Sequence, residues 1–106
     1  MVSIKNLRFS NHLRDERNER LKNIHAIGLG QIVKEQWYTS CYHCLTDTGV
    51  MLVVDKDGTY CMTMYFADYK EVNRMYAGRV PKYIQSKVDK NMAAGLVERR
   101  KQYELR

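Results

Sequence analysis

The sequence predicts a single α+β domain with a four-stranded antiparallel sheet, one N-terminal helix and two C-terminal helices. Three observations favour this fold class. Residues 50–66 contain two strand-like runs around an Asp-Gly turn, residues 68–97 carry helical start and stop signals, and 106 residues suffice for one core but not for two. We therefore expect one domain over residues 1–106, with residues 98–106 as a basic C-terminal extension.

The clearest element is a β-hairpin over residues 50–66. Its arms, VMLVV and TYCMTMYF, are rich in β-branched and aromatic residues, and Gly58 in the turn tolerates the positive φ that such a turn requires. Successive strand side chains point to opposite faces, so alternation divides the second arm into two sets. The core face is expected to hold Tyr60, Met62, Met64 and Phe66, and the other face Cys61, Thr63 and Tyr65.

The first element expected along the chain is a helix over residues 10–24, with Ser10 or Asn11 as its N-cap. At helical spacing, an apolar stripe is formed by Leu13, Leu21 and Ile24. Arg17 projects near the middle of this stripe. Its side chain either covers the edge of the core with its aliphatic stem or points its guanidinium across the sheet towards a site.

Two further strands are expected between this helix and the hairpin. Gly28 and Gly30 end the helical pattern, and the run over residues 31–39 that follows is rich in strand-forming residues. Residues 42–45 and a turn at residues 47–49 then lead into the hairpin. Short connections between these strands predict an antiparallel meander, one face of which needs a helical cover.

Two helices are expected after the hairpin. Asp68 and Glu71 have the spacing of a capping box for a short helix that Gly78 ends. Pro81 begins the last helix, at a position where its missing N–H costs nothing. The buried face of the last helix is expected to hold Ile84, Val88, Met92 and Leu96.

The chain has a formal net charge of +6 at pH 7. A polyanion is therefore the first partner to consider, and nucleic acid is the commonest one, because cationic side chains that neutralise phosphates release counterions. Solvated charge that only keeps a small domain soluble is the alternative. The residues expected to bind nucleic acid are Arg14, Arg20, Lys82, Lys87, Lys90, Arg99, Arg100 and Lys101.

Several classes of protein are disfavoured by the composition. No stretch approaches the roughly 20 apolar residues of a membrane span, and residues 1–9 lack the apolar region of a secretion signal. We therefore expect a cytoplasmic protein without a membrane partner. Three cysteines, an odd number, disfavour a disulfide framework. We expect no metal or other cofactor, and the residues do not predict the oligomeric state.

The cysteines suggest two kinds of chemistry that we do not expect here. Cys41, Cys44 and Cys61 with His43 nominally offer four zinc ligands. Strand alternation puts Cys41 and Cys44 on opposite faces, so they could not bind one ion without a bulge. A cysteine nucleophile needs a helix N-terminus or a cation beside it to lower its pKa, and neither is adjacent in the sequence. We expect the cysteines to pack as small hydrophobic side chains.

A metal-free catalytic site is the third candidate. Cleavage of RNA by its own 2′-hydroxyl needs a base, an acid and a cation near the phosphate. His12 and Arg17 on the first helix, with Thr63 and Tyr65 on the non-core strand face, supply such groups. They converge only if the helix lies along an edge of the sheet. An exposed His12 without a function is the alternative.

The helix sequence FSNHLRDERNERL and the strand sequence VVDKDGTYCMTMY together resemble the barnase-, colicin- and RelE-like toxin ribonucleases over residues 9–66. The resemblance implies an RNA-cleaving site in which His12 is the general acid or base, while Arg17 and Thr63 stabilise the phosphate. It also implies a protein of phage or mobile-element character. The chain departs from that family in two places: the usual second helix is reduced to residues 23–30, and the C-terminal helices have no counterpart.

The leading expectation is a small basic phage-type protein that binds nucleic acid, with RNA favoured. Metal-independent endoribonuclease activity is the stronger form of this hypothesis. The alternative is a non-enzymatic phage protein that binds and inhibits a host defence protein, as anti-CRISPR proteins do. Eight tyrosines suit a protein interface as well as nucleic-acid bases, so the residues alone leave both alternatives open.

Overall fold

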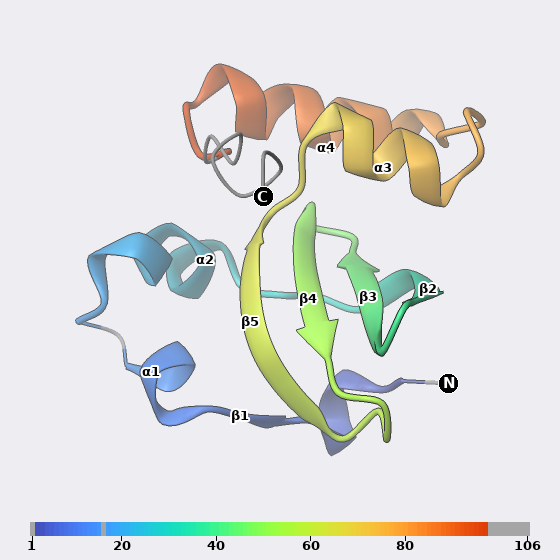
Figure 1. The fold of residues 1–106 in the computed structure, drawn as a ribbon. Helices are drawn as coiled ribbons and strands as arrows, with labels where there is room; N and C mark the ends of the chain where they lie inside the picture. Colours follow the sequence, from blue (N-terminus) through green and yellow to red (C-terminus); the bar gives the residue numbers. More distant parts are fainter. Residues whose placement is uncertain (1, 16, 98–106) are drawn as a thin grey trace.

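The computed structural model describes residues 2–15 and 17–97, which form an α+β fold as predicted. Within these residues the chain contains a five-stranded sheet in the order β1-β5-β4-β3-β2 (Figure 1). The strands are β1 (Arg8–Phe9), β2 (Ile32–Tyr38), β3 (Cys41–Thr46), β4 (Val50–Val54) and β5 (Tyr60–Phe66). The helices are α1 (Asn11–Arg14), α2 (Lys22–Ile27), α3 (Tyr69–Met75) and α4 (Lys82–Ala93), with 3-10 turns η1 (Ile4–Asn6) and η2 (Glu19–Leu21).

Strands β2 to β5 form the predicted antiparallel meander, but the sheet has one more strand than predicted. β1 pairs with β5 in parallel, with Arg8 opposite Tyr60 and Phe9 opposite Cys61. The prediction of four strands, all antiparallel, is therefore wrong at this edge. A strand of two residues is too short to show the alternation by which strands are recognised in a sequence.

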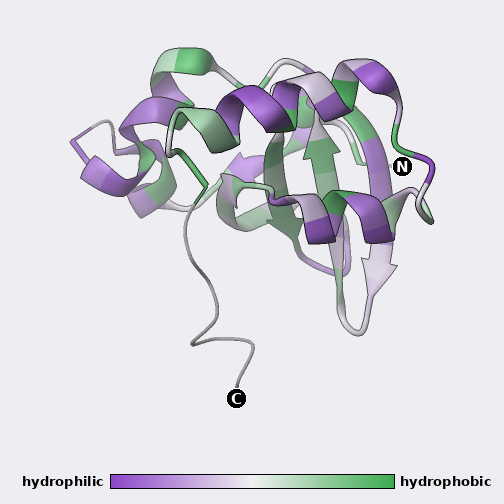
Figure 2. Cartoon of the chain, turned by 90° about the horizontal axis from the view of Figure 1, so that it is seen from above, coloured by the Kyte–Doolittle hydropathy of each residue, from purple (hydrophilic) through white to green (hydrophobic). Residues whose placement is uncertain are grey.

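Hydrophobic side chains cover both faces of the sheet. The first core lies on one face and joins β3, β4 and β5 to α1, α2 and the N-terminal segment, while the second core lies on the other face and joins the same strands to α3 and α4. Figure 2 shows largely hydrophobic central strands beside helices that carry many hydrophilic residues. The prediction that one face is covered is wrong, because β4 alternates buried side chains, Leu52 into the first core and Met51 into the second.

The helix predicted over residues 10–24 is broken into α1, η2 and α2. Asp15 and Asn18 adopt extended backbone, with ψ of 107° and 108°. Their side chains bind nearby backbone, since the N–H of Arg17 donates to Asp15 Oδ1 at 3.0 Å and that of Arg20 donates to Asn18 Oδ1 at 3.1 Å. Asp and Asn compete with helical hydrogen bonding in this way. The predicted apolar stripe is nevertheless buried: Leu13, Leu21 and Ile24.

The predicted hairpin turn between β4 and β5 is confirmed. The N–H groups of Thr59 and Tyr60 donate to Asp55 Oδ1 at 3.0 and 3.1 Å. Gly58 has a φ of +73°, a conformation that residues with a side chain rarely adopt. The carboxylate and the glycine together account for the tight reversal of the chain.

β5 contains a bulge that changes which side chains face the cores. Val54 lies opposite Cys61 and Val53 lies opposite Thr63, so Met62 is the extra residue. The simple alternation predicted for this strand is therefore wrong before the bulge. Cys61 joins Met64 and Phe66 in the first core, Tyr60 is half-buried, and Met62 is 40% exposed. The buried side chains of β5 are Cys61, Met64, Tyr65 and Phe66.

The capping box before α3 is confirmed. The N–H of Glu71 donates to Asp68 Oδ1 at 2.9 Å, and the N–H of Asp68 donates to Glu71 Oε1 at 3.3 Å. Pro81 stands immediately before α4, as the start signal predicted. Both starts depend on local backbone chemistry, which explains why the sequence reveals them.

The buried face of α4 is confirmed in its first half only. Ile84 and Val88 are buried, but Met92 is 39% exposed and α4 ends at Ala93, before Leu96. Asn91 is buried instead, and its Nδ2 donates to the carbonyl oxygen of Thr48 at 3.1 Å. Leu96, beyond the end of the helix, is half-buried and packs against the first core.

Candidate nucleic-acid interface

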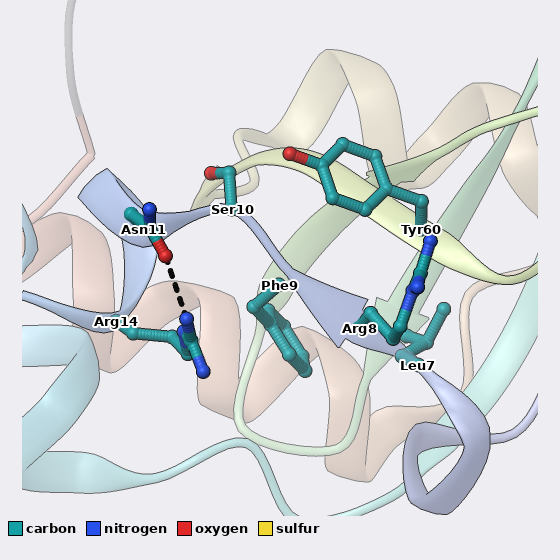
Figure 3. A pocket seen from close by; sticks show the side chains of 7 residues that line it. All are labelled: Leu7, Arg8, Phe9, Ser10, Asn11, Arg14 and Tyr60. Carbon is teal, nitrogen blue, oxygen red and sulfur yellow. Dashed lines mark hydrogen bonds between the residues drawn. The ribbon is translucent and has the colours of Figure 1, made fainter.

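A pocket of about 470 Å³ opens at the β1 edge of the sheet. Its lining combines positive charge, aromatic rings and hydrogen-bonding groups, and consists of Leu7, Arg8, Phe9, Ser10, Asn11, Arg14 and Tyr60. Figure 3 shows Arg14 and Asn11 on one side of this pocket and Arg8 and Tyr60 on the other, with the side chain of Phe9 between them. We call it the β1-edge pocket.

β1 positions one arginine of the pocket through its pairing with β5. The N–H of Arg8 donates to the carbonyl oxygen of Thr59 at 2.9 Å, and the register sets Arg8 beside Tyr60. Neighbouring side chains of a strand point to opposite faces. Phe9 accordingly packs against the first core while Arg8 is exposed. The pairing of β1 with β5 thus places the cation of Arg8 beside the phenol ring of Tyr60.

α1 positions the second arginine. Ser10 is the N-cap residue, and one turn of helix brings Arg14 back over Asn11, so that Arg14 Nη2 donates to Asn11 Oδ1 at 2.6 Å. Leu13 anchors this turn in the first core. An amide oxygen holds a guanidinium in place without neutralising its charge. Arg14 can therefore still attract an anion.

Asp55 is the acidic neighbour of Arg8. The pKa of its carboxyl lies below the ordinary value, first because the N–H of Thr59 donates to it, and further through the N–H groups of Tyr60 and Gly58 and the positive charge of Arg8. The carboxylate is thus ionised at neutral pH, and its hydrogen bonds are made within the hairpin turn.

His12, predicted to be catalytic, lies at the rim of the β1-edge pocket. It is exposed on α1, and its Nδ1 is 3.1 Å from Oγ of Ser10, which lines the pocket. The side chain of Arg17 is 92% exposed, and its Nε is 3.3 Å from Asp15 Oδ1. Neither orientation predicted for Arg17, along the core edge or across the sheet, is correct, because Asp15 ends α1 and turns the chain outward.

Thr63, the third residue predicted to be catalytic, lies on the other side of the sheet. It is paired with Val53, whose side chain packs against the second core. α1, in contrast, is anchored in the first core through Leu13. The structure therefore brings His12 to the β1-edge pocket and does not bring Thr63 there. The catalytic roles of these residues stay predictions.

Of the other basic residues predicted to bind nucleic acid, those on α4 lie away from this pocket. Lys82, Lys87 and Lys90 belong to α4, which Figure 1 shows at the opposite end of the molecule from β1. Arg20 Nη1 donates to the carbonyl oxygen of Met64 at 3.3 Å. Arg99, Arg100, Lys101 and the rest of the predicted C-terminal extension lie outside the described residues.

The site prediction missed Arg8, Phe9, Ser10, Asn11 and Tyr60. A signal for some of them exists in the sequence, because Arg-Phe directly precedes a helix cap and combines a cation with a ring. What the sequence does not contain is the pairing of β1 with β5, which places Tyr60 beside Arg8.

The three cysteines, all within the described residues, are free thiols. Burial raises the pKa of Cys44 and of Cys61 to about 12. Both thiols are therefore protonated at neutral pH, which disfavours a nucleophilic role because the thiolate is the reactive form. Within residues 2–15 and 17–97, no group of three or more His, Cys, Asp or Glu side chains is arranged to hold a metal ion.

A search of the described helices finds none that is long and apolar enough to cross a membrane. Comparison with protein-family models, with curated proteins and with solved structures finds no match to this chain. The case for a function therefore depends on the geometry and charge of its own residues.

Proposed function

We propose that this protein binds nucleic acid, with RNA as the favoured form, through the β1-edge pocket. The observation that supports the proposal best is the gathering of two arginines and two aromatic rings around one open pocket. Arginine recognises phosphate through its planar set of donors, and aromatic rings stack on unpaired bases. The net charge of +6 supports the same partner, since it attracts a polyanion at long range.

Arg14 has the chief role in this proposal. Its guanidinium is oriented by Asn11 Oδ1 and keeps its full charge. Arg8 supplies a second cation across the pocket, with the ring of Tyr60 beside it and the ring of Phe9 between the two arginines (Figure 3). The two arginines can each bind a phosphate of one nucleic-acid strand, and a ring between them can stack on a base of the same strand.

Ribonuclease activity is a separate part of the proposal. Of the residues predicted to be catalytic, His12 is the one beside the pocket, through Oγ of Ser10. In this scheme its imidazole takes the proton of the 2′-hydroxyl as that oxygen bonds to phosphorus, and the 5′-oxygen leaves as the P–O5′ bond breaks and takes a proton from water. The arginines stabilise the charge that develops on the phosphate. Thr63 on the second-core face has no part in this version of the site.

The binding proposal is tested by fluorescence anisotropy with a labelled RNA of mixed sequence at several salt concentrations. We expect an affinity that falls steeply with salt. The salt slope of Arg8→Gln/Arg14→Gln should be smaller, by about one unit for each phosphate that this variant no longer neutralises. Lys82→Gln/Lys90→Gln is the matched variant on α4. If the α4 variant binds more weakly and the β1-edge variant does not, the pocket is the wrong surface. No binding at low salt would contradict the proposal altogether.

The ribonuclease part is tested by incubating the metal-free protein with the same RNA and identifying the fragment ends. We expect 2′,3′-cyclic phosphate ends that are absent with His12→Ala. Uncleaved RNA in the presence of tight binding contradicts catalysis and leaves the binding proposal standing. Full cleavage by His12→Ala contradicts the role of His12.

A second candidate function, binding to a host protein, is favoured by a different surface. Trp37 and Tyr38 at the end of β2 are 51% and 46% exposed. Exposed tryptophan and tyrosine are enriched at protein interfaces. Inhibition of a host defence protein would then act through the tip of the β2–β3 hairpin, and Trp37→Ala would abolish inhibition without changing RNA affinity.

A further inference from the structure

A second, smaller cavity adjoins the β1-edge pocket. It has a volume of about 230 Å³, lies between α1, α2 and β5, and is lined by Phe9, Leu13, Arg14, Ile24, His25, Gly28, Leu29 and Met64. The two cavities share Phe9 and Arg14, so one ligand could occupy both. Pockets for drug-sized ligands measure about 300–1,000 Å³, so the small cavity suits a smaller group.

One of the residues that line this cavity carries a polar atom without a partner. His25 on α2 is half-buried, and its Nε2 is buried without a hydrogen-bond partner among the described residues. A buried polar atom of this kind is costly unless a ligand or water satisfies it. Depending on its tautomer, Nε2 can donate or accept a hydrogen bond. The cavity also has room at Gly28, where a Cβ would meet no atom within 4 Å.

The chemistry of the two cavities together defines the occupant. The inner cavity has apolar walls formed by Leu13, Ile24, Leu29 and Met64. It is also lined by His25, whose Nε2 has no partner among the described residues. The guanidinium of Arg14 stands at its junction with the outer pocket, where Arg8 provides a second positive charge. A flat apolar group with a polar edge, joined to an anion by a short linker, complements this arrangement. An unpaired nucleotide has these parts.

We propose that the inner cavity receives one unpaired nucleobase, whose edge hydrogen-bonds to His25 Nε2 while its phosphate is bound by Arg14 and Arg8. This inference rests on the proposed nucleic-acid binding and adds its substrate class, single-stranded nucleic acid. A base held in a duplex would first have to leave its stack, which costs a few kcal/mol. Selectivity for single strands therefore follows from the cavity and not from the surface charge.

The wild-type protein is tested with three labelled probes at one salt concentration: a single-stranded RNA, the same RNA as a duplex, and a strand of equal charge in which the bases are removed. We expect the single strand to bind at least about tenfold more tightly than either of the others. Equal affinity for the abasic strand would overturn the base pocket while leaving phosphate binding intact. Failure of all three probes to bind would instead overturn the proposed function.

Two substitutions of His25 sharpen the test. His25→Leu removes the hydrogen bond and keeps an apolar side chain, and we expect about a tenfold loss of affinity for the single strand with no change for the abasic strand. His25→Gln restores an amide near the position of Nε2 and should recover most of the loss. If His25→Leu weakens both probes equally, or neither, His25 does not contact a base. Thermal unfolding of both variants checks that they are folded.

Discussion

The two edges of the sheet both carry aromatic rings and cations but use them differently. At the β2 edge the rings meet cations of the protein itself. The guanidinium carbon of Arg74 lies 4.9 Å from the centre of the Tyr38 ring, and Lys34 Nζ lies 5.3 Å from that of Tyr76. Such cation–π contacts join β2 to α3 and contribute about 0.5–1 kcal/mol each at exposed sites.

At the β1 edge a neutral group orients one of the cations. Arg14 is held by the amide oxygen of Asn11, and the rings of Phe9 and Tyr60 line an open pocket. The β2 edge is also secured by a long ladder with β3, from Ile32 to Tyr38, whereas β1 contributes two residues. The cations of the β2 edge thus join two elements of the fold, whereas the guanidinium of Arg14 lies at the opening of a pocket.

Matched charge reversals test this contrast most directly. Arg14→Glu removes a charged hydrogen-bond donor and repels phosphate, so we expect RNA affinity to fall by about 100-fold, or about 2.7 kcal/mol. Arg74→Glu makes the same change of charge at the β2 edge and should alter the affinity by less than about threefold. Both are measured by fluorescence anisotropy. Equal reductions in affinity would show that only the net charge matters and would remove the distinction between the edges.

The alkylation rates of the two buried cysteines measure how readily the strand at each edge of the sheet separates from its neighbour. Cys61 lies beside β1, opposite Phe9, and Cys44 lies beside β2, opposite Glu35. Burial raises the pKa of both thiols to about 12, so their intrinsic reactivity is matched. We expect Cys61 to be alkylated about tenfold faster, a difference of about 1.4 kcal/mol in opening free energy, because two residue pairs are easier to separate than a long ladder.

This second prediction is measured by mass spectrometry on variants that retain a single cysteine, Cys41→Ser/Cys44→Ala and Cys41→Ser/Cys61→Ala. Faster labelling of Cys44 would contradict the idea that the β1 edge is the less stable one. It would also contradict the expectation that the edge with the proposed binding pocket is the more easily opened edge of this sheet.

The capping box of α3 is expected to stabilise the fold without affecting the β1-edge pocket. Asp68→Ala removes the acceptor for the N–H of Glu71, and we expect the free energy of unfolding to fall by about 1 kcal/mol. RNA affinity should not change, because α3 packs on the second core and the β1-edge pocket adjoins the first. Urea denaturation gives the stability, and Asp57→Ala in the β4–β5 turn is the control.

The smallest effect is expected at the exposed tip of the β2–β3 hairpin. The rings of Trp37 and Tyr42 make an edge-to-face contact with centroids 5.1 Å apart. Trp37→Ala should lower the free energy of unfolding by about 0.5–1 kcal/mol. An aromatic pair contributes about this free energy in addition to that of burying its apolar surface. RNA affinity should be unchanged. A marked loss of RNA binding would extend the interface to both edges.

Much of the fold could be predicted because the sequence signals of its turns and helix starts are local. Gly58 and Asp55 mark a turn, and Asp68 with Glu71 marks a helix start; each signal acts within a few residues of the chain. The apolar spacing of residues 10–24 predicts one helix. The same spacing is compatible with the three short helical segments α1, η2 and α2, which bury the same side chains. Spacing could not show that Asp15 and Asn18 would bind backbone and interrupt it.

The candidate site was predicted only in part, for a reason of the same kind. Arg14 and His12 belong to one short helix and could be singled out from charge and residue type. Thr63 was grouped with them through simple alternation along β5, and the sheet in fact separates it from α1, since its partner Val53 packs on the second core. Which sheet face α1 covers is a long-range property that residue type does not determine.

Local backbone chemistry and composition are enough to predict the class of the fold, the hairpin, the caps of α3 and α4 and the basic character. Long-range packing, in contrast, is what brings Arg8 and Phe9 into the sheet beside Tyr60 and Cys61. Two residues are too few to show a periodic pattern in the sequence. The cores that hold both segments in place stabilise their pairing. That pairing creates the pocket on which the proposed function depends.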